Sequence, residues 1–145
     1  MTRSQQKGFT LVELVIVITV LGVLAAVAVP KFFDFTGDSK EAACKAGLGG
    51  VRAAIANYYS YTATPAGGGS ASYPTLVQLT TAGTVMSTAG IPNNPYSSAT
   101  AKNAVIAGTT KGTAETDGTD GGWCYKAATG EFWADTASGA GEAAF

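Results

Sequence analysis

The sequence predicts an α+β fold, in which a long N-terminal helix with an apolar first half packs against a small antiparallel β-sheet head. Three patterns favour this class. Residues 9–29 form an apolar run with a single carboxylate. Apolar residues at helical spacing continue after it, which predicts an amphipathic helix. Near the C-terminus, two aromatic-rich runs, residues 123–127 and 131–135, flank a turn at residues 128–130 and predict a hairpin.

The apolar run is long enough to cross a bilayer. As a helix, its 21 residues would measure about 31 Å, the thickness of the hydrocarbon core. Glu13 lies near its start, and a carboxylate at the centre of a membrane helix costs about 2.5–3.5 kcal/mol, with less cost near an end. Such a residue is expected to have a function and a partner. The preceding residues 1–8 are polar and include Arg3 and Lys7.

Residues 8–13 read Gly-Phe-Thr-Leu-Val-Glu. This string resembles the processing signature of type IV pilins and of type II secretion pseudopilins. The resemblance implies that residues 1–8 are a leader peptide, cut between Gly8 and Phe9, and that the new Phe9 amine is methylated. It also implies subunit docking, in which Glu13 neutralises the Phe9 amine of a neighbour inside a dry filament core. An ordinary signal anchor, with Arg3 and Lys7 in the cytoplasm, is the alternative.

Residues 9–30 are therefore expected to lie in the membrane before assembly and in the filament core afterwards. Gly22 and Pro30 match positions that, in the pilin family, bracket a segment that loses helicity in the filament. Pro30 has no N–H for the carbonyl of Ala26, and glycine has a low helix propensity. A mere kink in a membrane helix is the alternative.

Residues 31–61 are predicted to form the amphipathic second half of the same helix, which would end near Tyr61. One stripe of this half is apolar, with residues spaced by 3 or 4 positions: Cys44, Leu48, Val51, Ile55 and Tyr58. This stripe is the expected contact with the sheet. The helix and head together form the lollipop that the pilin resemblance also implies.

Residues 62–145 are predicted to form the globular head. It begins with a Gly-rich linker at 62–72, followed by a short helix at 73–79 with Thr75 as its cap. Two prolines predict a turn at 92–96, and a weak strand is expected at 104–107. A loop at 113–122 leads into the hairpin, and residues 136–145 form a small tail.

The chain has two cysteines, Cys44 and Cys124, which the expected topology places outside the cytoplasm, where disulfides persist. A disulfide between them would stabilise the fold by about 4 kcal/mol. The alternative is two small buried hydrophobic residues. Strand alternation raises a conflict, because it puts Cys124 on the face opposite Trp123 and Tyr125. If Cys124 meets Cys44, both aromatic side chains point away from the helix.

A Gly-rich loop at 116–122 contains Asp117 and Asp120, which could bind calcium through oxygen atoms. It loosely resembles the calcium loop of major pseudopilins but lacks the EF-hand spacing. We expect a solvated turn, with calcium as the alternative and no other cofactor. Residues 92–96 resemble the Pro-x-Asp-Pro-aromatic turn of major pseudopilins, but Asn94 replaces the acid. This replacement weakens both the prediction of calcium binding and the assignment as a pseudopilin.

Composition argues against catalysis and nucleic-acid binding. The chain has no histidine, 13% charged residues, a net charge of −1 and no basic patch. Histidine-based triads and a Gly-Lys phosphate loop are absent from the sequence, so we expect no enzyme activity. The predicted function is that of a structural subunit, the major pilin of a type IV pilus. Type II secretion pseudopilin is the alternative, and a membrane-tethered extracytoplasmic binding module is a remote one.

The resemblance also implies the partners and the location of the protein. The partners are other copies in a homopolymer, a prepilin peptidase that also methylates, and an assembly platform with its ATPase. The precursor would lie in the inner membrane. The assembled protein would lie outside the cell in a surface pilus, or in the periplasm if it is a pseudopilin.

Overall fold

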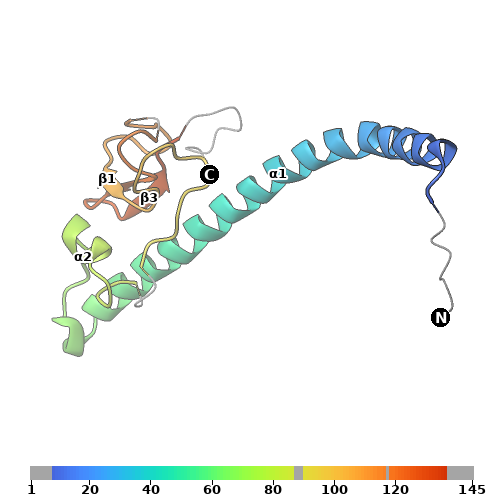
Figure 1. Ribbon diagram of the computed structural model, residues 1–145. Coiled ribbons are helices and arrows are strands. Elements are labelled where there is room, and N and C mark those ends of the chain that lie inside the picture. Colours follow the sequence, from blue (N-terminus) through green and yellow to red (C-terminus); the bar gives the residue numbers. More distant parts are fainter. Residues whose placement is uncertain (1–7, 87–89, 117, 137–145) are drawn as a thin grey trace, which may run out of the picture. The chain divides into compact units, whose positions relative to one another are not determined.

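The computed structural model describes residues 8–86, 90–116 and 118–136 (Figure 1). The chain divides into two units, residues 1–38 and 39–145, which are described separately. Helix α1, Leu11–Thr62, contributes to both units and contains Pro30 without interruption. The predicted helix over residues 9–61 is thus confirmed to within two residues at either end.

The first unit contains the apolar half of α1 and has no core of its own. Among the described side chains of residues 8–33, all are exposed except that of Ala28, which is half-buried. Exposure of the large apolar side chains here runs from 46% at Val15 to 77% at Phe9. This half of α1 is long and apolar enough to cross a membrane by length and composition.

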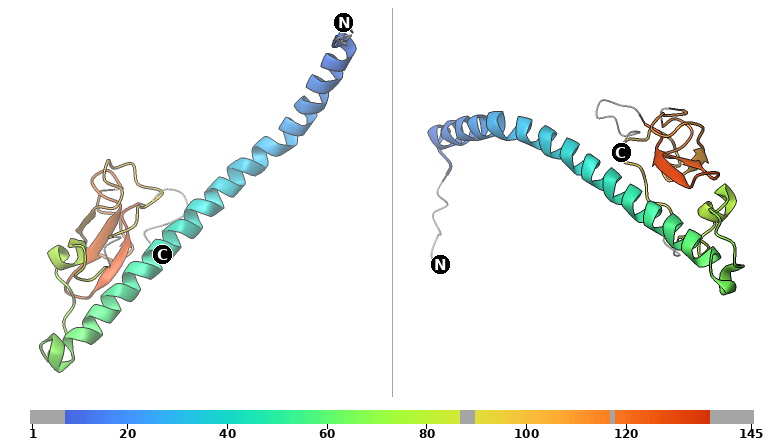
Figure 2. Two further views of the ribbon diagram at one scale, coloured as in Figure 1. Left: turned by 60° about the horizontal axis from the view of Figure 1, so that its bottom comes forward. Right: turned by 180° about the vertical axis from the view of Figure 1, so that it is seen from behind.

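The second unit contains the head, built where the amphipathic part of α1 packs against the sheet. Figure 2 shows the orange and red strands beside the green end of this helix. Cys44, Leu48, Val51 and Ile55 are all at most 2% exposed, as the stripe predicts. They share one apolar cluster with Trp123, Tyr125 and Phe132 of the sheet. The helix and the sheet therefore share a single apolar core.

The sheet has three strands in the order β1-β2-β3, at Val105–Ala107, Trp123–Lys126 and Glu131–Ala134. β2 and β3 form the predicted antiparallel hairpin, in which Cys124 pairs with Trp133. The prediction of a wholly antiparallel sheet is wrong, because β1 runs parallel to β2. Parallel pairing needs a crossover of about a dozen residues or more, and residues 108–122 supply it.

The short elements follow local sequence signals. A 3₁₀ turn, Pro65–Gly67, lies within the predicted linker. Helix α2, Leu76–Thr80, begins after Thr75, whose hydroxyl accepts from the Gln78 N–H while the Gln78 side chain accepts from the Thr75 N–H. This capping box confirms the predicted cap. Of the predicted tail, Thr136 is buried, and residues 137–145 lie outside the described residues.

Candidate functional site

The first turn of α1 holds the Glu13 carboxylate in a defined position. Its Oε2 accepts from the Thr10 N–H at 2.9 Å and from the Thr10 hydroxyl at 2.8 Å. The Glu13 N–H in turn donates to Thr10 Oγ1 at 3.3 Å. This reciprocal pattern is a capping box, which satisfies backbone donors that a helix start leaves free. The carboxylate is thereby kept at the end of the helix, one turn from Phe9.

Thr10 is the residue of this site that the sequence reasoning missed. The Thr-x-x-Glu spacing of residues 10–13 is a helix-start signature that could have identified it. The predicted processing pair lies directly before it. Both Gly8 and Phe9 are exposed, and a Cβ placed on Gly8 would meet no described atom within 4 Å. The bond between Gly8 and Phe9 is therefore open to an enzyme.

Residues 3–29 match the family model described as the prokaryotic N-terminal methylation motif. The fimbrial protein EcpC of Eikenella corrodens is 43% identical over 60 residues, which cover 41% of this chain and 39% of that protein. A type IV narrow pilus major component of Thermus thermophilus is 50% identical over 50 residues, covering 34% of this chain and 43% of that one.

The N-terminal segment of this chain is thus similar to that of type IV pilins. A type IV major pilin of Myxococcus xanthus is 39% identical over 58 residues, or 40% of this chain and 26% of the other. The matches to these three pilin relatives span between 26% and 43% of their length. No solved structure matches this chain significantly.

Gly22 and Pro30, the predicted ends of a melting segment, lie within continuous α1 in this single chain. A Cβ on Gly22 would meet no described atom within 4 Å, so packing inside the chain does not require glycine there. Melting in the filament stays a prediction, because it concerns the assembled state.

The structure contradicts the predicted disulfide, because Cys44 and Cys124 are buried thiols that are not bonded to each other. They lie on opposite faces of β2. Cys44 belongs to the cluster between helix and sheet, whereas Cys124 packs with Trp133 on the far face. Strand alternation forces this outcome once Trp123 and Tyr125 face the helix. The conflict noted in the sequence is thus resolved in favour of the aromatic residues.

The Cys124 thiol donates to Oδ1 of Asp135 at 3.2 Å. Burial, together with this carboxylate, raises the pKa of the Cys124 thiol. Because the thiolate is the nucleophile in disulfide exchange, the thiol is held in its unreactive form.

Asp135 is the centre of a buried polar network that anchors the loop before β2. Its Oδ1 accepts from the N–H groups of Glu115 at 2.6 Å and Thr116 at 3.0 Å. Its Oδ2 accepts from the Thr116 hydroxyl and from the Gly118 N–H at 3.2 Å. Burial acts to raise the pKa of Asp135, but the hydrogen bonds from Thr116, Cys124 and Glu115 outweigh it and lower the pKa.

Of the two predicted calcium ligands, only Asp120 lies among the described residues. Asp120 is exposed, and Asp117 lies outside the described residues. Within the part of the chain that the structure describes, no group of three or more carboxylates, thiols or imidazoles could hold a metal. Asn94, which replaces the acid of the related turn, is fully buried, and its amide donates to the Gly122 carbonyl at 2.6 Å. Calcium binding by Asp117 and Asp120 stays a prediction.

Proposed function

We propose that this chain is a structural subunit, the major pilin, of a type IV pilus, rather than an enzyme. The observation that carries the proposal is an exposed apolar half-helix with a carboxylate in its first turn. The similar proteins support it, since they are named as a fimbrial protein, a pilus component and a major pilin. These names favour a pilus over a pseudopilus.

The apolar surface of the exposed half of α1 must be shielded from water by lipid or by protein. Apolar patches larger than a few hundred Å² are rare on soluble monomers and mark interaction or membrane surfaces. In the precursor, lipid of the inner membrane covers this half-helix. In the filament, the same half-helices of other copies replace the lipid, so that one surface serves both states.

Glu13 controls the exchange between these two environments. Among the described residues of the single chain, Thr10 is the hydrogen-bond partner of this carboxylate, and a buried charge also needs an opposite charge. Cleavage between Gly8 and Phe9 creates a cation at the right depth, the Phe9 amine. In a filament that amine pairs with Glu13 of a neighbouring copy.

The proposal includes the machinery that the signature implies. A prepilin peptidase would cut after Gly8 and methylate Phe9, and a platform with an ATPase would drive extraction from the membrane. The fibre would then lie on the cell surface. Because a Cβ on Gly8 would meet no described atom within 4 Å, its replacement by a large residue should block cleavage without disturbing the fold. A start at Phe9 in the intact mass of fibre subunits is the expected result.

Surface fibres provide the decisive test. Cells carrying Glu13→Ala should insert normal amounts of protein into the membrane but shed at least about tenfold fewer fibres, as expected from losing a buried ion pair worth several kcal/mol. Val12→Ala, in the same exposed turn, is the matched control. Electron microscopy of sheared fibres with peptide identification gives the measurement. Normal fibre numbers with Glu13→Ala would refute this role, and fibres confined to the periplasm would indicate the pseudopilin.

A further inference from the structure

The head carries an extended surface without charge. No residue from 53 to 101 is acidic or basic. This stretch supplies the end of α1, the 3₁₀ turn and α2. Its side chains are mainly those of Tyr, Ser, Thr, Asn and small residues. In antibody paratopes, Tyr, Ser, Gly and Asn provide rigid contact area and adaptable hydrogen bonds.

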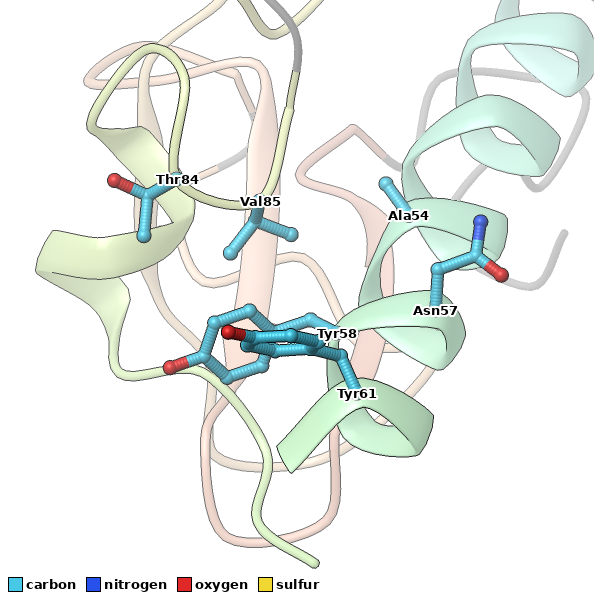
Figure 3. A pocket seen from close by; sticks show the side chains of 6 residues that line it. All are labelled: Ala54, Asn57, Tyr58, Tyr61, Thr84 and Val85. Atoms are coloured by element: carbon cyan, nitrogen blue, oxygen red, sulfur yellow. The ribbon is translucent and has the colours of Figure 1, made fainter. Parts of the chain in front are cut away.

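A cavity of about 270 Å³ opens in this uncharged surface. It lies between the last turns of α1 and the loop after α2 (Figure 3). Val85 and Thr84 project from the loop on one side, and Asn57 lies on the helix on the other. The remaining lining comes from Ala54, Tyr58 and Tyr61. The cavity is just below the range of about 300–1,000 Å³ for drug-sized ligands, so it suits a smaller group.

The polar groups of this lining are not used by the rest of the head. Among the described residues, the side chains of Asn57, Tyr58 and Thr84 have no hydrogen-bond partner. Tyr61 is committed through its hydroxyl, which donates to the Ala66 carbonyl at 3.2 Å and fixes the ring. Its ring remains 55% exposed. The site therefore offers an oriented aromatic surface and three uncommitted polar groups.

We propose that this cavity binds one ring of a neutral saccharide. A pyranose ring presents an apolar face of C–H groups, which packs on a tyrosine ring, and hydroxyls at its edge. Those hydroxyls can donate to the Asn57 and Thr84 oxygens and accept from their N–H and O–H groups. A charged ligand is disfavoured, because neither the lining nor residues 53–101 supply an opposite charge to offset its desolvation.

Calorimetry on the full-length chain tests the proposal without requiring fibres. The chain is held in lauryldimethylamine oxide micelles, since maltoside detergents would compete, and titrated with cellohexaose and with free glucose. We expect saturable binding whose affinity changes less than about twofold between about 50 and about 500 mM NaCl, because no charges meet. Binding of cellohexaose alone would identify a glycan chain as ligand. Equal binding of glucose would identify a single sugar ring.

Single substitutions locate the site. Tyr61→Ala should weaken binding about tenfold, as expected for loss of an aromatic contact worth about 1.5 kcal/mol. Asn57→Ala should weaken it about fivefold, through a hydrogen bond of about 1 kcal/mol. Tyr59→Ala is the matched control, because Tyr59 packs on Tyr73 instead, with ring centroids 4.5 Å apart.

Three results would overturn the proposal. One is absence of heat and of tyrosine fluorescence change with both sugars at millimolar concentration. Another is equal binding by wild type and Tyr61→Ala. The third is binding of a proline hexapeptide but of neither sugar, which would assign the cavity to a peptide. Each is measured on single chains, so the result is independent of whether the protein forms pili.

Discussion

Replacing Asp135 by Asn tests how the head holds the loop before β2. The carboxylate is 0% exposed and accepts from three backbone N–H groups, a hydroxyl and a thiol. An amide has one acceptor oxygen. If that oxygen takes the place of Oδ1, the new NH₂ group faces the Gly118 N–H, and that donor loses its acceptor.

The magnitude follows from these contacts. A buried donor without a partner costs about 1–3 kcal/mol, and each retained hydrogen bond weakens by about 1 kcal/mol when its charge is lost. The lower cost of burying a neutral amide offsets part of this sum. We expect Asp135→Asn to lower the free energy of unfolding of the head by about 2–4 kcal/mol.

Urea unfolding of the full chain in micelles, followed by near-ultraviolet circular dichroism, gives the measurement. Trp123 and Trp133 report on the head, and the Trp133 indole donates to the Thr113 carbonyl in the loop itself at 2.7 Å. Asp120→Asn is the matched control, an identical change at an exposed position in the same loop, and should cost less than about 0.5 kcal/mol. Equal effects of the two substitutions would refute the anchoring role.

The pKa of Asp135 adds a dependence on pH. A carboxyl whose pKa is lowered by folding stabilises the fold above its unfolded pKa of about 3.9, and this stability is lost as the pH falls. Wild type should therefore lose more stability than Asp135→Asn between about pH 6 and pH 3. Parallel curves for the two proteins would contradict the lowered pKa.

Three further predictions concern the thiols, a turn and the helix. Unfolding without reductant should let Cys44 and Cys124 both react with a thiol reagent, whereas protection of both would show a disulfide. Gly130→Ala should lower the free energy of unfolding by at least about 2 kcal/mol, since φ is +71° and a Cβ would lie 2.3 Å from the Tyr73 ring. A filament map should show non-helical backbone ending before Pro30, and Pro30→Ala should restore helix there. Unbroken helix in the wild-type filament would refute melting.

Local patterns predicted the helical and hairpin elements because each depends on residues close in sequence. The apolar run and the stripe from Cys44 to Ile55 fix one helix through its period of about 3.6 residues. The Thr75 capping box and the alternation around residues 128–130 likewise act within a few positions. The N-terminal signature, with Glu13 in an apolar helix, also indicated the similarity to type IV pilins from the sequence itself.

Tertiary packing decided what depends on residues far apart. No local signal sets the direction of β1, because residues 108–122 are long enough for either pairing. The disulfide prediction failed for a related reason. Sequence put Cys124 and its aromatic neighbours on opposite faces, but only packing decided which face meets α1, and burying Trp123 and Tyr125 there removes more apolar surface than burying one thiol. Asp135 reaches a loop 17 to 20 positions away, a distance at which carboxylate and amides meet only through the completed fold.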